Sequence, residues 1–249
     1  MSLKKTYFAS DFHLGSPTYE KSRQREALVV NWLNEVAKDA QAIYLVGDIF
    51  DFWFEYKNTI PKGHIRFIGK IAELVDKGIE IHMFTGNHDM WMFDYFEKEL
   101  GIKIIREPIN KEINGKKFHI GHGDGLGPGD YSYKFIKKFF SSKICQWFFK
   151  RVHPNLGVSV ANAWSNRSRE KEGELVFLGP EKEWLIQYCK EILEKKHFDF
   201  FIFGHRHIPI DYDFPNGSKY INLGDWINHF TYAELDGESL NLKKYNRTN

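Results

Sequence analysis

The stretch Ala42-Ile-Tyr-Leu-Val-Gly-Asp48 determines the fold class of this chain. Its apolar residues run without interruption to Val46, and a glycine and a carboxylate follow at once. A short continuous apolar run of this kind is typical of a strand buried on both faces of a parallel sheet. Ligands of such sheets bind beyond the carboxyl ends of the strands, and Asp48 stands at such an end.

The segments on either side of this strand alternate between strand and helix patterns. Thr6–Ser10 is a short β-type run, and Arg23–Asp39 has apolar residues at helical spacing. After the strand, Ile65–Asp76 predicts a second helix, and Glu80–Thr85 predicts a third strand that ends at Gly86-Asn87. This β-α-β-α-β order predicts a parallel sheet with right-handed crossovers.

The second half of the chain is dominated by hairpin signals. Asn-Gly or Asp-Gly pairs flanked by strand-like runs mark tight turns; they occur at Asn114-Gly115, Asn216-Gly217 and Asp236-Gly237. A helix is expected near Glu181–Lys195, and a helical insertion at about residues 130–172. We therefore expect an α/β fold of two packed sheets flanked by helices, in one domain over residues 1–249, with the insertion as a cap over the strand ends.

Composition limits the class of protein. The chain has 249 residues and 42% hydrophobic content, which is enough for one large core. We expect no signal peptide and no membrane-spanning run, and the two cysteines, Cys145 and Cys189, favour a reducing cytoplasmic location. A formal charge of +2 gives no reason to expect nucleic-acid binding, and nothing indicates an obligate protein partner.

Short motifs of Asp, Asn and His recur at the ends of the β-rich runs. They are Asp11-Phe-His13, Gly47-Asp48, Gly86-Asn87-His88-Asp89, Gly121-His122 and Gly204-His205-Arg206-His207. Oxygen and imidazole ligands without thiolate suit Mn²⁺, Fe²⁺ or Zn²⁺. Each motif alone is common in surface loops, but the complete ordered set predicts a pair of divalent metal ions that shares one bridging carboxylate, for which Asp48 is the best candidate.

This ordered set resembles the calcineurin-like metallophosphoesterase superfamily, whose motifs read D-x-H, G-D, G-N-H-[DE], G-H and G-H-x-H. The resemblance implies a four-layer α/β/β/α sandwich of two mixed sheets. It implies that Asp11, His13, Asp48 and His207 hold one ion, and that Asp48, Asn87, His122 and His205 hold the other. It also implies that His88 contacts the phosphate, with Asp89 as its orienting partner.

Within the superfamily, the chain is similar to the pyrophosphatases that cleave UDP-2,3-diacylglucosamine to UMP and 2,3-diacylglucosamine 1-phosphate in bacterial lipid A synthesis. The matching stretches are Phe8–Leu14, Tyr44–Trp53 and His122–Leu126, followed by an aromatic, basic insertion. The resemblance implies manganese dependence, a lid for the acyl chains and peripheral contact with the cytoplasmic side of the inner membrane. It also implies substrate contacts at Asp130 and Tyr133, and Asn166 and Arg169 are further candidates for contact with the nucleotide or diphosphate; a solvated surface role is at least an equal alternative for each.

One position departs from this pattern. The best-known pyrophosphatases of the family read G-N-R-D, where this chain has His88, so another nucleotide-sugar, a phosphomonoester or a phosphodiester stays an alternative substrate.

The insertion has two possible interpretations. It carries an apolar helical stripe from Phe135 to Val152 with a fringe of Lys and Arg. Such a stripe either contacts lipid or an anionic membrane surface, or packs on the rest of the protein.

Overall fold

Two mixed sheets form the centre of the computed structural model, which describes residues 4–129, 131–160 and 176–246. The first sheet has six strands in the order β11-β10-β1-β2-β3-β4. Strands β1 to β4 are parallel, and the C-terminal hairpin pairs antiparallel with β1. The strands are β1 (Lys5–Ala9), β2 (Ala40–Val46), β3 (Glu80–Phe84), β4 (Ile104–Ile105), β10 (Thr231–Asp236) and β11 (Ser239–Lys244).

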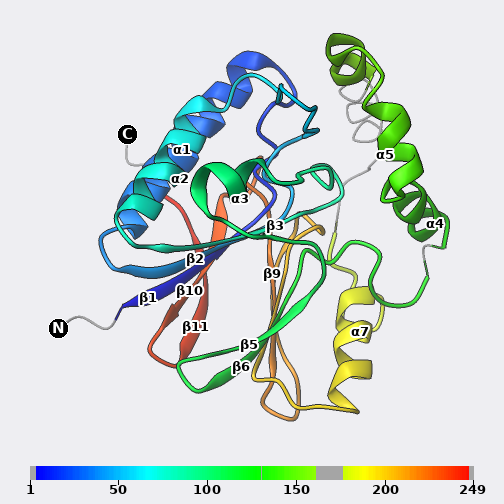
Figure 1. Ribbon diagram of the computed structural model, residues 1–249. Helices are drawn as coiled ribbons and strands as arrows, with labels where there is room; N and C mark the ends of the chain where they lie inside the picture. Colours follow the sequence, from blue (N-terminus) through cyan, green and yellow to red (C-terminus); the bar gives the residue numbers. More distant parts are fainter. Residues whose placement is uncertain (1–3, 130, 161–175, 247–249) are drawn as a thin grey trace.

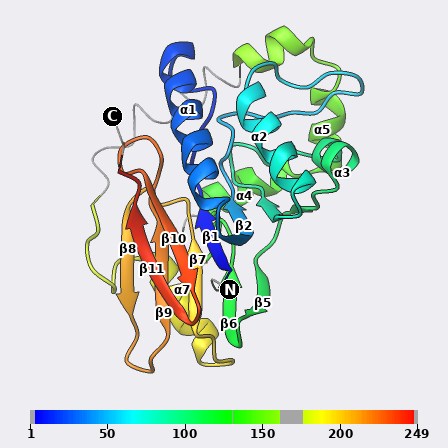
Figure 2. The same cartoon turned by 90° about the vertical axis from the view of Figure 1, so that its left-hand side faces the viewer.

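The second sheet has five strands in the order β5-β6-β7-β9-β8. Its central strands β6, β7 and β9 are parallel, while β5 and β8 are antiparallel edges. The strands are β5 (Ile109–Ile113), β6 (Lys116–Ile120), β7 (Phe200–Phe203), β8 (Pro209–Asp213) and β9 (Lys219–Leu223). All three predicted hairpin turns are confirmed, and Figure 2 shows the hairpin β10–β11 beside β8 and β9 of this sheet.

Three apolar clusters hold four layers together, which confirms the predicted sandwich. One lies between the first sheet and helices α1 (Tyr19–Val36), α2 (Ile65–Asp76) and α3 (Tyr95–Leu100). The second lies between the two sheets, where Phe8 stacks on Phe118. The third lies between the second sheet and α7 (Trp184–Leu193). Figure 1 shows these helices on the two outer faces.

Helix starts were the least accurate part of the prediction. Helix α1 begins at Tyr19 rather than Arg23, because the Thr18 side chain accepts a hydrogen bond from the amide of Lys21 and caps a first turn that has no apolar pattern. Short α3 and β4 were not predicted. No helix in the described ranges is long and apolar enough to cross a bilayer.

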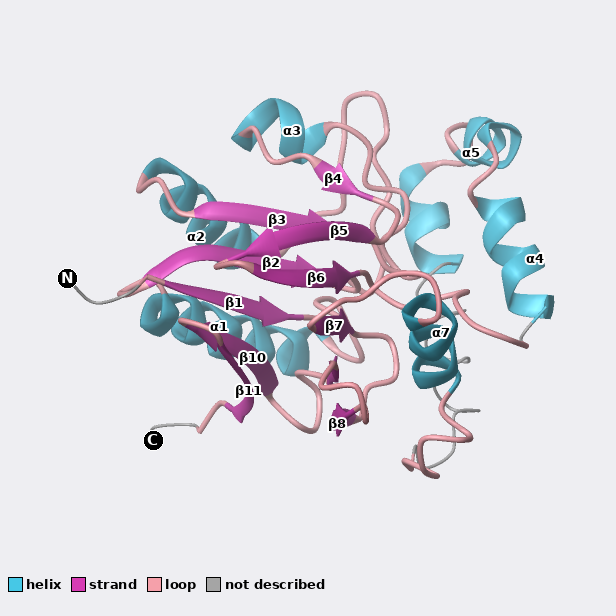
Figure 3. Cartoon of the chain, turned by 90° about the horizontal axis from the view of Figure 1, so that it is seen from below, coloured by secondary structure: helices cyan, strands magenta, loops and turns pink. Residues whose placement is uncertain are grey.

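The insertion contains α4 (Tyr131–Phe140), α5 (Lys143–Phe149) and a further helical stretch at 154–160. In Figure 3 the parallel strands point toward the side of the molecule where α4 and α5 lie. The carboxyl ends of the parallel strands therefore lie on the same side of the molecule as α4 and α5.

Candidate metal centre

Every predicted ligand lies within a few residues of the carboxyl end of a parallel strand. Asp11 and His13 follow β1, Asp48 follows β2, and Asn87 follows β3 in the first sheet. In the second sheet His122 follows β6, and His205 and His207 follow β7. Because the two sheets pack face to face with these ends on one side, residues nearly 200 positions apart in sequence meet there, as the 3.1 Å contact of His13 with His207 shows.

The backbone at this edge is held in an unusual conformation. Five of the predicted ligands have left-handed φ angles: Asp11 (57°), His13 (44°), Asp48 (51°), His205 (67°) and His207 (54°). Residues with a Cβ rarely adopt this region, and such strain persists only where the surrounding structure imposes it. The loops do brace one another, since the Asp11 amide donates to the Gly47 carbonyl and the His13 amide donates to the Asp48 carbonyl.

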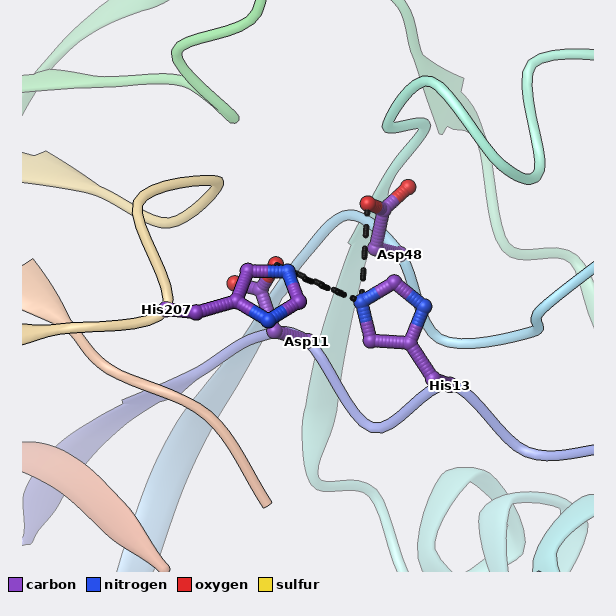
Figure 4. A group of neighbouring side chains, drawn as sticks. All are labelled: Asp11, His13, Asp48 and His207. Atoms are coloured by element: carbon purple, nitrogen blue, oxygen red, sulfur yellow. Dashed lines mark hydrogen bonds and ion pairs between the residues drawn. The ribbon is translucent and has the colours of Figure 1, made fainter. Parts of the chain in front are cut away.

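Four side chains converge in the first group (Figure 4), with ligand atoms from Asp11, His13, Asp48 and His207 all within 4.8 Å of one another. The Nε2 atoms of His13 and His207 lie 3.1 Å apart. Asp11 Oδ1 lies 3.2 Å from His207 Nε2. Asp11 keeps this oxygen free of backbone contacts because its other oxygen accepts hydrogen bonds from the Ser10 hydroxyl and the His205 amide.

A second group shares Asp48 with the first. Asp48 Oδ2 lies 3.7 Å from His13 Nε2 on one side and 3.3 Å from His122 Nε2 on the other. His205 belongs to the same group, and Asn87 Oδ1 lies 3.3 Å from His122 Nε2. The second oxygen of Asp48 accepts a hydrogen bond from the His88 amide, so the carboxylate is fixed between the two groups. This is the position required of a bridging ligand.

The hydrogen-bond chemistry of these residues fits bound cations. His122 Nδ1 lies 2.9 Å from the Val46 carbonyl, which makes it the donor and leaves Nε2 as an acceptor facing the oxygens of Asp48 and Asn87. Acceptors that face acceptors require positive charge between them. Burial lowers the pKa of His122, but the carboxylates of Asp48, Asp11 and Asp124 together outweigh burial and raise this pKa to about 10, so the position favours positive charge, either as a proton on the ring or as a bound metal ion.

His88 has a different partner from the one predicted. The carboxylate of Asp89 is fully buried and accepts hydrogen bonds from the amides of Ile49, Phe50 and Gly86, so it locks two ligand loops together. The ring of His88 instead places Nδ1 3.1 Å from the Asp51 carbonyl oxygen and 3.7 Å from Asp51 Oδ1. The orienting contact predicted for Asp89 therefore belongs to Asp51.

Asp51 and Asp225 are supporting residues to which the sequence reasoning assigned no chemistry. Asp51 Oδ1 lies 3.4 Å from His13 Nδ1, and Asp225 Oδ2 lies 3.7 Å from His207 Nδ1, so each carboxylate stands behind a histidine of the first group. A signal was present for Asp225, because Gly224-Asp225 after β9 repeats the Gly-Asp pattern of Gly47-Asp48.

The predicted substrate contacts are mostly beyond what the structure describes. Asp130, Asn166 and Arg169 lie outside the described residues, and Tyr133 lies in α4. These four residues stay sequence-based expectations.

The segment from α4 to α5, residues 131–149, contacts residues near this edge on one side and exposes hydrophobic side chains to solvent on the other. Lys137 Nζ lies 2.8 Å from Asp124 Oδ2, and the Trp91 indole donates to the Phe140 carbonyl at 2.9 Å. Phe149 packs on Trp91 with 4.7 Å between ring centroids. Among the side chains that the structure describes, seven large hydrophobic ones of the segment are exposed: Tyr131, Phe135, Ile136, Phe139, Ile144, Trp147 and Phe148. Of the two interpretations of the insertion, packing on the rest of the protein is met by Phe140 and Phe149, and contact with lipid or a membrane surface stays a prediction.

Comparisons with known proteins agree with this geometry. The family model for calcineurin-like phosphoesterases matches residues 4–209. A Porphyromonas gingivalis protein named UDP-2,3-diacylglucosamine hydrolase is 39% identical, with 96% of this chain and 97% of that protein covered. An Actinobacillus succinogenes protein of the same name is 27% identical, with 97% and 100% covered.

Solved structures show the same fold at low sequence identity. A hypothetical protein from Pyrococcus horikoshii gives a TM-score of 0.50 at 10% identity, with 98% of this chain and 90% of that chain covered. One assignment follows from the family model, the P. gingivalis relative and the ligand groups at the strand ends. The chain belongs to the calcineurin-like phosphoesterase family, as a metal-dependent hydrolase of phosphorus esters or anhydrides.

Proposed function

We propose that this protein hydrolyses the diphosphate of UDP-2,3-diacylglucosamine and releases UMP and 2,3-diacylglucosamine 1-phosphate. The observation that carries the proposal is the placement of two ligand groups joined by Asp48 next to a segment with exposed apolar side chains. The first feature suits a diphosphate, and the second suits acyl chains. The name shared by the P. gingivalis and A. succinogenes relatives supports the same substrate.

The ligand groups would hold two divalent ions, for which we propose Mn²⁺. Asp11, His13 and His207 would bind one ion; Asn87, His122 and His205 would bind the other; Asp48 would bind both. Bound there, the ions would supply positive charge to the phosphoryl oxygens and a water of lowered pKa. The protein's part is to keep each imidazole in the right tautomer, as the Val46 carbonyl does for His122.

His88 is the residue that we propose to contact the phosphoryl group directly. Its Nδ1 lies 3.1 Å from the Asp51 carbonyl oxygen, and its ring lies 4.7 Å from the ring of His13, so His88 stands beside the first ligand group, where an imidazole could donate to a phosphoryl oxygen or protonate the departing group. Its side chain is 18% exposed, whereas that of His13 beside it is fully buried. That difference fits a residue that meets substrate rather than a ligand.

The α4–α5 segment is proposed to act as a lid that covers the acyl chains. Its exposed aromatic side chains would bury against the acyl chains, and its Lys residues would face the anionic groups of the substrate or of a membrane surface. The contacts of Lys137 with Asp124, two residues after His122, and of Phe140 with Trp91, four residues after Asn87, support a lid from which both halves of the substrate could be reached at once.

UMP release with Mn²⁺ tests the proposal, with UDP-2,3-diacylglucosamine, UDP-glucose and p-nitrophenyl phosphate compared at equal concentrations. We expect fast release from the acylated substrate and little turnover of the other two. Turnover of p-nitrophenyl phosphate without UMP release would keep the hydrolase and reject the substrate, and His88→Arg would then be the first variant to assay. No turnover of any of the three would reject the proposal.

A further inference from the structure

His205 and His207 sit on a loop whose conformation needs support from outside. Both residues have left-handed φ angles, and the loop between them turns at Arg206. One side of the loop is held by hydrogen bonds: the Asn222 side chain donates to the Gly204 carbonyl, and the His205 amide donates to Asp11. The side chain of Arg206, between the two histidines, holds the loop from the side of α7.

Arg206 reaches the first residues of α7. Its Nε donates to both carboxylate oxygens of Glu183, at 3.0 and 3.1 Å. The guanidinium carbon lies 4.3 Å from the centroid of the Trp184 ring, within the range of a cation–π contact. The Trp184 ring in turn lies 6.4 Å from the His205 ring. The start of α7 therefore contacts both Arg206 and one of the adjacent histidines.

This pair is buried. The side chain of Glu183 is 2% exposed and that of Arg206 is 12% exposed. A buried carboxylate that loses its cation is left with an uncompensated charge, so the two side chains strongly constrain each other. The Arg206 guanidinium is engaged by Glu183 at the start of α7, and an arginine side chain is not a metal ligand.

We propose that Arg206, held by Glu183 and Trp184, is a positioning residue that fixes His205 and His207 in the geometry needed to bind the two metal ions. The inference rests on the proposed metal pair. Because His205 would serve one ion and His207 the other, a single brace would set the preorganisation of both sites. Without it, the strained loop would relax and the binding of each ion would include the cost of reordering it.

The test measures Mn²⁺ binding by calorimetry on chelator-treated protein, before any assay of turnover. Arg206→Met should raise the Kd for Mn²⁺ by about 10- to 100-fold, as loss of a residue that supports metal ligands typically does. Arg206→Lys keeps the charge but not the planar fork, so an intermediate Kd is expected. Lys190→Met is the matched control, because it removes another ion pair of α7, the exposed Lys190–Glu181 contact, and should leave the Kd unchanged.

Turnover gives a second readout. For Arg206→Met, more Mn²⁺ should be needed for half-maximal rate, while the rate at saturating Mn²⁺ stays within a few-fold of the unaltered protein, since every ligand is still present. A loss of rate that Mn²⁺ cannot restore, with unchanged Kd, would overturn the proposal.

Folding defects are separated by the double variant Arg206→Met, Glu183→Gln, which leaves no buried charge unpaired. If circular dichroism shows it folded and its Kd equals that of the unaltered protein, the brace has no role in metal binding. If the variants bind Mn²⁺ weakly and even the unaltered protein releases no UMP, the brace stands and only the proposed substrate fails.

Discussion

The metal edge and the α4–α5 segment depart from the usual distribution of polarity in opposite directions. At the edge, charged and polar side chains are buried: Asp11 and His13 are fully inaccessible. In the segment, large apolar side chains are exposed, with Phe135 71% and Trp147 50% accessible. Neither arrangement is favourable by itself, because buried charge needs compensation and apolar surface avoids water. The metal edge is therefore suited to cations, and the exposed side chains of the segment are the surface that we propose for the acyl chains.

The largest effect is expected where the two ligand groups meet. Asp48→Asn removes the charge shared by both groups and should lower turnover on the order of 10³-fold, as loss of a central electrostatic contact does. Elemental analysis should show fewer than two ions per chain. Asp211→Asn, which breaks an exposed ion pair with Lys219, is the control and should change neither quantity. A variant of Asp48 with two ions and full activity would remove the bridge from the proposal.

The second test concerns the exposed side of α4. Phe135 and Phe139 are one helical turn apart and share a face, so replacing both by Ser removes much of the apolar surface offered to an acyl chain. We expect kcat/KM for the diacylated substrate to fall about 10- to 100-fold. Hydrolysis of UDP-glucose, however slow, should not change.

Ile65→Ser supplies the matched control, since Ile65 is 73% exposed at the start of α2. An equal loss with both substrates would mean that α4 supports the fold of the site rather than the lipid.

These two regions also differ in how well the sequence predicts them. The convergence of the candidate ligands could be predicted because each follows a strand within a few residues, so the motif carries both the residue type and its place at the edge. Contacts between side chains of separate elements could not be predicted in this way. Asp51 rather than Asp89 meets His88, and Glu183 meets Arg206, because packing between separate elements decides these contacts. For α4–α5, the apolar stripe was visible in sequence, but which side chains pack and which stay exposed depends on Trp91 and its neighbours.

Lys137 connects the two regions, and its removal should have a smaller effect. The lysine contacts both the carboxylate and the backbone carbonyl of Asp124, two residues after His122. Its side chain is 29% exposed, so the ion pair is worth about 1 kcal/mol, and Lys137→Met should lower kcat/KM for the diacylated substrate about 5-fold. Lys138→Met, at an exposed neighbouring position, is the control. If the two variants behave alike, α4 is held by its aromatic contacts and not by this pair.

His119 offers a buried histidine that needs no cation, and it sharpens the contrast with the metal edge. Its ring nitrogens lie 2.6 Å from Asn110 Oδ1 and 3.2 Å from the Tyr188 hydroxyl, so the protein alone satisfies them. Burial lowers the pKa of His119 from 6.5 to about 4. As the pH falls below 6.5, the unfolded chain gains a proton at this residue and the folded chain does not. Folding stability is therefore lost between these two values and is fully present above them.

Comparing the unaltered protein with His119→Gln isolates this contribution. In metal-free samples, the free energy of unfolding of the unaltered protein should fall by about 2 kcal/mol more than that of the variant between pH 7 and pH 5. Denaturant titrations at several pH values measure the difference, and turnover at neutral pH should be the same apart from any loss of overall stability. Parallel pH curves would show that His119 takes up a proton in the folded state as readily as in the unfolded chain. Its hydrogen bonds would then not hold the ring neutral. His119 would differ less from the histidines of the metal edge, in its tendency to take up positive charge, than its hydrogen-bonded surroundings imply.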